Sequence, residues 1–464
     1  MKQTQESFYN ICRYIIFKNI TTYIISIKFL FFNELMATHP YSDKDLDYSD
    51  YSPAETDIII SRKKYLDQLQ GFWLGQSIGN WTGIITEMDK IEYPFYTDKN
   101  WGKRDQKNIW GSFISPKDTI ITYYFVEDEE PWFADDDTDI EYMYQHLLDI
   151  HNVSILSPTQ IREGWLNHIY SNETAPKGEN FLWVSNETAF YLMLDGLSTP
   201  QTSEPENNPY YSMIDAQLTT EIFGLFSPVQ YKVALKMAEL PIRVTAKFDA
   251  EWVSKFYVKM HSLSSYLDST LTMKKQIHFI SRKARKELPD NSYSAKMYDF
   301  IEQSYLNNPD KNDWEKTRDE VYVRYQLNSN DGYTYKNPFD SGINFAASLI
   351  SLFYGSGDFK RTIQIGTLTG WDSDNPTATW GGLLGFILGK KKLEKIFNKY
   401  DFSDQYWIHR TRKNFVDRTG KTKGEDSFQL MAMRALFIID RVVIEEMNGG
   451  VDLEKNIWYI PNTE

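Results

Sequence analysis

Residues 370–385 read GWDSDNPTATWGGLLG, in which acidic side chains lead directly into a run of small and apolar residues. Asn375 and Pro376 are typical of a helix N-cap followed by proline in the first turn. The small, apolar residues that follow predict a helix in the protein interior. Asp372 and Asp374 would then lie at the mouth of a buried helix, where an unpaired carboxylate is costly. No basic residue occurs in this segment, so a bound cation is the simplest partner.

A second acidic stretch, FADDDTDIEYMY, occupies residues 133–144 and also leads into an amphipathic pattern. One or two aspartates at a helix start are ordinary, because they cap free backbone N–H groups and favour the helix dipole. Three in succession, Asp135, Asp136 and Asp137, repel one another unless a cation lies between them. A solvated acidic turn is the alternative interpretation of this stretch taken alone.

Two glycine series recur at four-residue spacing, and both adjoin chemically interesting residues. They comprise Gly71, Gly75, Gly79 and Gly83 in the first, and Gly381, Gly385 and Gly389 in the second. On a helix this spacing forms one bare ridge, which lets another backbone approach closely. Helix packing is the simplest interpretation of the ridges themselves.

Apolar residues elsewhere recur at three- and four-residue spacing, so the fold is predicted to be all-α. We expect one helical domain over residues 58–450, with a charged helical elaboration at 272–335. Residues 451–464 are expected to form a C-terminal tail, with a possible short strand at Trp458 to Ile460. With 41% hydrophobic residues the chain can form a large core, and no linker or repeat divides it.

The net charge of −14 makes nucleic acid an unlikely partner, because an acidic surface repels phosphate backbones. The single cysteine, Cys12, excludes an intrachain disulfide and a thiolate metal cluster. Residues 1–35 are interpreted either as preceding a true start at Met36 or as a weak export signal. Their longest uncharged run, 19–27, is too short to span a membrane. We therefore expect no stable membrane insertion and, of the two compartments, favour the cytoplasm over export.

The two acidic stretches together predict a metal site built from oxygen ligands. All-oxygen ligation is the chemistry of hard cations, hence Mg²⁺, with Mn²⁺ possible. Four or five carboxylates at two helix starts suit two ions a few ångströms apart. The seven histidines show no HExxH spacing, and the chain contains neither an EF-hand loop nor a GxxxxGK[ST] loop.

Three motifs in order resemble the ADP-ribosylglycohydrolase family. Residues 79–87, GNWTGIITE, are similar to the family's G-D-x-x-G-x-x-x-E motif at the end of a glycine-rich helix. DDDT at 135–138 resembles T-D-D-T, and DSDN at 372–375 resembles D-x-D-T before a small-residue helix. Residues 196–218 also resemble the middle of some bacterial members. The likeness extends over most of residues 60–450 and implies the family's helical fold with a central two-metal cleft.

The resemblance implies a role for each matching residue. The implied metal ligands are Asp135, Asp136, Asp137, Asp372, Asp374 and Asn375. Glu87 matches the family's catalytic glutamate, and weaker substrate contacts are implied for Gly79, Asn80, Gly83 and Trp371. Asp135 and Asn375 each replace a threonine, Asn80 replaces an aspartate, and the family's Asn-Gly-Ala-Ala-Met-Arg stretch is missing.

The implied activity is hydrolysis at the anomeric carbon of ADP-ribose, with an ADP-ribose conjugate as the partner. Trp81, Trp110 or Trp371 would stack on adenine, unless they belong to the core. Two other functions stay open: a non-catalytic ADP-ribose or nucleotide-binding module, which the altered motifs permit, and another two-metal hydrolase acting on a glycoside or phosphoester. The cleaved linkage and the oligomeric state are not defined by the sequence.

Overall fold

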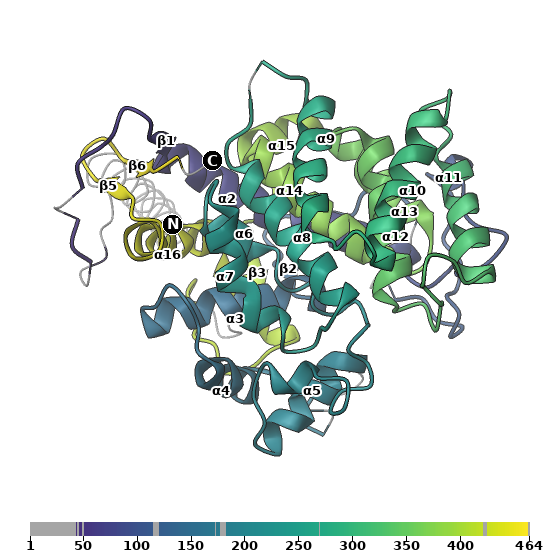
Figure 1. Ribbon diagram of the computed structural model, residues 1–464, viewed down its shortest axis with the longest axis horizontal. Helices are drawn as coiled ribbons and strands as arrows, with labels where there is room; N and C mark the ends of the chain where they lie inside the picture. The colour runs from purple at the N-terminus through teal and green to yellow at the C-terminus, as the bar shows by residue number, and fades with distance from the viewer. Residues whose placement is uncertain are drawn as a thin grey trace, which may run out of the picture.

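The structure is a computed structural model that describes residues 43, 46–48, 51–114, 120–171, 173–176, 182–268, 270–420 and 425–462. Cys12 and the expected leader at 1–35 lie outside the described residues. Helices dominate the described part, which confirms the predicted fold class (Figure 1).

The α-helices in the first half are α2 (Arg62–Gly83), α3 (Asp136–His151), α4 (Pro158–His168), α5 (Val184–Leu194), α6 (Ile222–Phe226), α7 (Tyr231–Ile242) and α8 (Asp249–Ser264). The second half contains α9 (Met273–Ala284), α10 (Tyr293–Asn307), α11 (Trp314–Val321), α12 (Ser341–Gly355), α13 (Phe359–Thr369), α14 (Asp374–Leu388), α15 (Lys390–Phe397) and α16 (Phe428–Glu445). Shorter helical turns are η1 (Ile84–Thr86), η2 (Asp98–Asn100), η3 (Gln201–Ser203), η4 (Arg285–Glu287), η5 (Tyr322–Leu327) and η6 (Ile408–Arg410).

The two glycine ridges pack against each other at the centre of the fold, on α2 and α14. A Cβ atom on Gly75 would lie 2.3 Å from the carbonyl oxygen of Gly381, and one on Gly385 would lie 2.2 Å from that of Gly71. Only glycine permits backbones this close, so the loss of helix propensity is offset by packing of the two main chains. The expected close approach of another backbone is confirmed, and each ridge is the partner of the other.

Helix α14 begins earlier than the sequence suggested. Its first residue is Asp374, with Ser373 at the N-cap, whereas Asn375 was the expected cap. Proline tolerates this position because the first-turn N–H groups of a helix have no intrahelical acceptor. The earlier start places both Asp374 and Asn375 in the first turn of the helix.

Two small sheets complete the described architecture. Strand β1 (Ile58–Ser61) pairs antiparallel with β6 (Ile457–Ile460), which pairs antiparallel with β5 (Gly450–Asp452). The second sheet joins β2 (Trp132–Phe133), β3 (Gln405–Trp407) and β4 (Glu425–Ser427). The possible C-terminal strand is therefore present, and it attaches the end of the chain to the start of α2.

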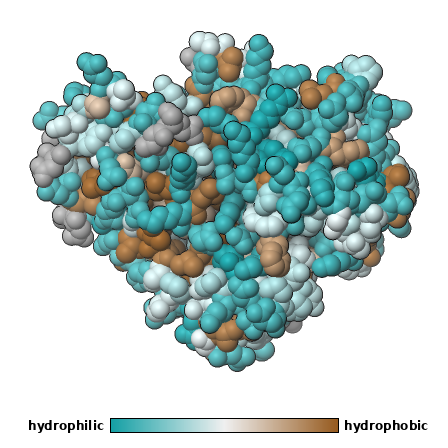
Figure 2. Space-filling view, viewed as in Figure 1, coloured by the Kyte–Doolittle hydropathy of each residue, from teal (hydrophilic) through white to brown (hydrophobic). Residues whose placement is uncertain are grey.

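The other helices surround the central contact between α2 and α14 (Figure 1). Residues 272–335, where a charged helical elaboration was predicted, contain α9, η4, α10, α11 and η5. The face drawn in Figure 2 is mainly hydrophilic, with apolar residues gathered left of its centre. In the part of the chain that the structure describes, no helix combines the length and apolar character required to cross a bilayer.

Candidate metal centre

The packing of α2 against α14 brings together residues far apart in the sequence. A Cβ atom on Gly83, at the end of α2, would lie 2.4 Å from the Cα of Asp374, at the start of α14. Glu87 follows η1, four residues after Gly83, and so emerges beside the same helix start. The hydroxyl of Ser373 fixes this junction by donating to the carbonyl oxygen of Gly83 at 2.9 Å.

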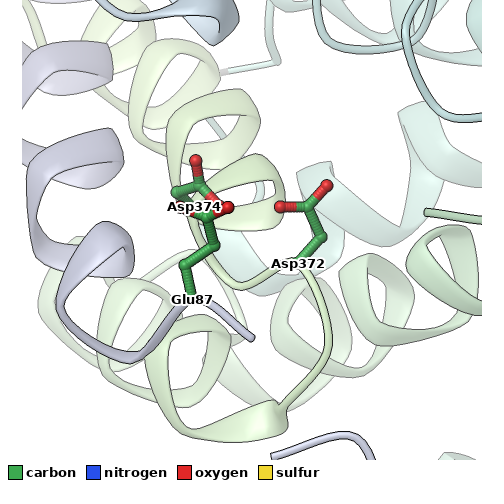
Figure 3. Close-up of side chains that lie close together, drawn as sticks. All are labelled: Glu87, Asp372 and Asp374. Carbon is green, nitrogen blue, oxygen red and sulfur yellow. The ribbon is translucent and has the colours of Figure 1, made fainter. Parts of the chain in front are cut away.

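Five carboxyl groups converge into two sets that share Asp374. Glu87, Asp372 and Asp374 each offer an oxygen within 4.8 Å of the others (Figure 3). Asp135 and Asp137, from the start of α3, form the second set with Asp374 at the same separation. The two acidic stretches of the sequence are thus brought to one place, with a single carboxylate at the centre of both sets.

The carboxylate oxygens of the two sets are ligands of the kind that a hard cation prefers. Asp137 Oδ1 and Asp374 Oδ1 are buried, and no N–H or O–H donor in the described structure reaches them. Among the described residues, no lysine or arginine forms an ion pair with any of the five carboxylates. Oxygens around an octahedral Mg²⁺ lie about 3–4 Å apart, given metal–oxygen distances of about 2.1 Å. The sets therefore have free oxygens close enough together to hold a metal ion.

The ionisation of the site supports the same conclusion. Burial, together with the neighbouring negative charges, raises the pKa of Glu87, Asp137 and Asp372 well above the ordinary range. Burial and the charge of Asp135 raise the pKa of Asp374 to about 6. Without a cation some of these groups must hold protons near neutral pH, and a metal ion would bind in competition with those protons.

Polar side chains hold the acidic groups in place. Asn80 Nδ2 donates to Asp137 Oδ2 at 3.0 Å and to Asp135 Oδ2 at 3.2 Å. The backbone N–H of Asp372 donates to Asn344 Oδ1 at 3.3 Å. Thr138 accepts the N–H of Asp135 at 3.4 Å, as one half of a capping box in which the Asp135 side chain accepts the backbone N–H of Thr138. Asn80, predicted as a weak substrate contact, thus lies beneath the carboxylates in this structure.

Three other acidic or amide residues occupy different positions. Asp136 does not join either set, although the charges of Asp135 and Asp374 help to raise its pKa. Asn375 accepts a hydrogen bond from Gln217 Nε2 at 3.4 Å. Asp139, from the same acidic stretch, forms a fully buried ion pair with Arg412 at 3.0 Å and lies in neither set. The roles of Asp136 and Asn375 as ligands remain predictions.

The remaining predicted contacts have packing roles in the structure. A Cβ atom on Gly79 would lie 2.0 Å from the carbonyl oxygen of Thr377, so this residue faces the backbone of α14, as does Gly83. Trp371 is fully buried, and its indole N–H donates to Gln326 Oε1 at 2.7 Å. Their participation in substrate binding stays a prediction.

Sequence reasoning did not identify Gln217 or Asn344 as members of this site. Gln217 lies in the 196–218 stretch, which resembles the middle of some bacterial ADP-ribosylglycohydrolases, but no local pattern marks its side chain. Asn344 is one of several buried polar residues in the apolar pattern of α12, so no local signal singled it out. Both contact the start of α14 only because of the tertiary fold.

Comparisons with known proteins identify the family of this chain. No curated protein matches the chain. A solved structure, described as an ADP-ribosylglycohydrolase-related protein complex, is 12% identical, with 81% of this chain and 99% of that chain covered and a TM-score of 0.46. The sequence pattern of the family described as ADP-ribosylglycohydrolase matches residues 61–424. That match covers most of the length of this chain. The chain therefore belongs to the ADP-ribosylglycohydrolase family, a family of glycohydrolase-type enzymes.

Proposed function

We propose that this protein hydrolyses the glycosidic bond at the anomeric carbon of ADP-ribose in an ADP-ribose conjugate, and that it requires two Mg²⁺ ions. The observation that carries the proposal is the pair of carboxylate sets that share Asp374. Asp135, Asp137 and Asp374 would hold one ion, while Asp372 and Asp374, with or without Glu87, would hold the other. When bound, such ions supply positive charge and lower the pKa of a coordinated water.

Glu87 is the residue best placed for direct chemistry. It is the partly exposed member of its set, whereas Asp372 and Asp374 are buried. A carboxylate there would stabilise the positive charge that develops on the ribose in an oxocarbenium-like transition state. Its raised pKa would also allow it to hold a proton for transfer to or from the reacting oxygen.

An exposed aromatic surface near the site supports a nucleotide substrate. Trp81 and Trp371 are buried, but Trp110 is 51% exposed, and its ring is stacked with Phe339 at a centroid distance of 6.3 Å. Phe339 in turn stacks with the exposed Trp183 at 6.5 Å. Nucleobases stack well on exposed aromatic rings, so this surface would hold the adenine.

One backbone hydrogen bond and one short sequence separation support a position of Trp110 and Phe339 near the acidic site. The N–H of Ile109, which precedes Trp110, donates to the carbonyl oxygen of Met88, next to Glu87. Phe339 lies five residues before Asn344, whose side chain accepts the N–H of Asp372. The adenine of one ADP-ribose would then contact Trp110 and Phe339, while its anomeric carbon would lie at the neighbouring carboxylate site.

The test is release of free ADP-ribose from an ADP-ribosylated protein or small conjugate. We expect release with Mg²⁺, loss of release with EDTA, and recovery when Mg²⁺ is added again. Binding of ADP-ribose without release would instead identify a binding module. Cleavage of a phosphoester in preference to every ADP-ribosyl linkage tested would identify a different hydrolase.

A further inference from the structure

A second layer of polar side chains lies one helical turn below the carboxylates. Gln76 precedes Asn80 by four residues on α2, Glu141 follows Asp137 by four on α3, and Thr379 follows Asn375 by four on α14. Glu221, four residues after Gln217, completes the layer just before α6. All four members of this lower layer, Gln76, Glu141, Glu221 and Thr379, are buried.

Short hydrogen bonds connect the lower layer. They join the same elements that carry the upper layer, which consists of Asn80, Asp137, Asn375 and Gln217. Gln76 Nε2 donates to Glu141 Oε2 at 2.6 Å and lies 3.5 Å from the carbonyl oxygen of Asp137. The backbone N–H of Ile222 donates to Glu141 Oε1 at 2.7 Å. The hydroxyl of Thr379 donates to Glu221 Oε1 at 2.6 Å.

The two glutamates are adjacent in the core, because the N–H that Glu141 Oε1 accepts belongs to Ile222, the residue after Glu221. Burial and the charge of Glu221 raise the pKa of Glu141 well above its ordinary range, and burial raises the pKa of Glu221 to about 7. Both oxygens of Glu141 already accept N–H donors, which favours its ionised form. Glu221 Oε2 is buried and receives no donor from the described residues, so it is the atom that can carry the proton and donate to Glu141.

No cation is available to replace this proton in the described structure. Neither glutamate forms an ion pair with lysine or arginine, and the groups that could hold a metal ion do not include them. Two titratable side chains lie near the pair: burial lowers the pKa of the His261 imidazole to about 4, whereas burial and the charge of Glu221 raise the pKa of Tyr257. The imidazole is therefore neutral near pH 7 and cannot balance a second negative charge.

We propose that Glu141 and Glu221 form a proton-sharing pair that positions the candidate metal ligands, with Glu221 as the neutral acid. The pair joins α2, α3, α14 and the segment before α6, each of which contributes a residue to the upper layer. Its hydrogen bonds go to Gln76, Ile222 and Thr379, none of which is a candidate ligand. This inference deepens the proposed function and rests on it for the role of the metal site.

Two substitutions at one position separate the shared proton from simple packing. Glu221→Gln keeps a donor at the position of Oε2, whereas Glu221→Leu removes the donor at similar volume. We expect Glu221→Gln to bind Mg²⁺ like wild type in a calorimetric titration. Glu221→Leu should bind it roughly 10–100-fold more weakly, the usual scale for a lost outer-shell partner. Thermal melting without metal shows whether each variant is folded.

Infrared spectroscopy tests the proton itself and does not depend on enzyme activity. With ¹³C-labelled glutamate and Mg²⁺ present, wild type at pH 6 should show a protonated carboxylic-acid band that Glu221→Gln lacks, because the pKa of Glu221 is raised to about 7. Absence of that difference would overturn the pair, even if the protein hydrolyses ADP-ribose conjugates. Equal Mg²⁺ affinities of the glutamine and leucine variants would overturn the positioning role. Failure of wild type to bind Mg²⁺ would refute the proposed metal site, while the infrared band would still decide the protonation of the pair.

Discussion

Replacing Asp374 with asparagine should abolish Mg²⁺ binding and yet stabilise the metal-free protein. Asp374 is buried and belongs to both carboxylate sets, so its loss removes a ligand from each candidate ion site. In the metal-free state the same side chain is unfavourable, because burial and Asp135 raise its pKa from 3.8 to about 6. Asparagine keeps the size of the side chain and removes the charge.

The size and pH dependence of this stabilisation follow from the pKa. The carboxyl group binds its proton more tightly in the folded state than in the unfolded state. Its ionisation therefore destabilises the fold fully above about pH 6, and the effect disappears below about pH 4. At pH 7 the cost is about 3 kcal/mol, since each pKa unit corresponds to about 1.4 kcal/mol. For a chain of this length that amounts to roughly 3 °C in melting temperature.

The assay is thermal melting of wild type and Asp374→Asn in EDTA and in Mg²⁺, at pH 7 and at pH 5. We expect the variant to melt higher in EDTA at pH 7, by less at pH 5, and to show no shift with Mg²⁺. Wild type should gain stability with Mg²⁺, by about 2.7 kcal/mol for one site at a concentration of one hundred times Kd. A variant that melts lower in EDTA at pH 7, or that retains wild-type Mg²⁺ affinity, would refute this reasoning.

Asp139→Asn is the matched control. Asp139 is also a buried aspartate in the same acidic stretch, but it pairs with the fully buried Arg412 at 3.0 Å. Removing its charge leaves the guanidinium without its partner, which typically costs 3–5 kcal/mol. Burial also raises the pKa of Asp139 to about 6, so the loss of its own buried charge and the loss of the ion pair act on stability in opposite directions. The readout that separates the two variants is therefore Mg²⁺ affinity, which Asp139→Asn should retain because Asp139 lies in neither carboxylate set.

Three further substitutions test the other parts of the site and fold. Glu87→Gln should lower turnover by roughly two to four orders of magnitude while ADP-ribose still binds, and wild-type turnover would leave Glu87 with a structural role only. Gly75→Ala should lower the melting temperature strongly or prevent folding, because its Cβ would lie 2.3 Å from the carbonyl oxygen of Gly381; a wild-type melting curve would contradict the close helix contact. Trp110→Ala should raise KM about tenfold or more with little change in kcat, given about 1–3 kcal/mol per stacked base. An unchanged KM would exclude adenine stacking on Trp110 and Phe339.

The sequence was informative where local pattern and chemistry coincide. Glycines at four-residue spacing predicted the close helix contact, and acidic residues before two helices predicted where the carboxylates would gather. These signals are local, because each depends on residues within a few turns of one helix. The earlier start of α14 at Asp374 was missed because Asn375 and Pro376 are equally compatible with a cap and with the first turn.

The parts that could not be predicted depend on contacts between distant segments. Nothing in the sequence distinguished Asp139 from Asp137 two residues earlier, yet the first pairs with Arg412 and the second joins a carboxylate set. The partner is 273 positions away, and only the tertiary fold brings its guanidinium to one of the two aspartates. Likewise Glu141 is an ordinary helical glutamate in sequence, and its burial against Glu221 is a property of the assembled core.

The glycine contact and the acidic site are therefore parts of one arrangement. Because Gly83 approaches the Cα of Asp374 so closely, the end of α2 and the start of α14 are fixed relative to each other before any ion binds. Asn80 and Gln76 lie on that same helix, and they donate to carboxylates of both layers. A larger residue in the glycine ridge would displace these donors as well as the backbone. The sequence has to retain bare glycines next to its carboxylates because the position of those carboxylates depends on direct contact between two main chains.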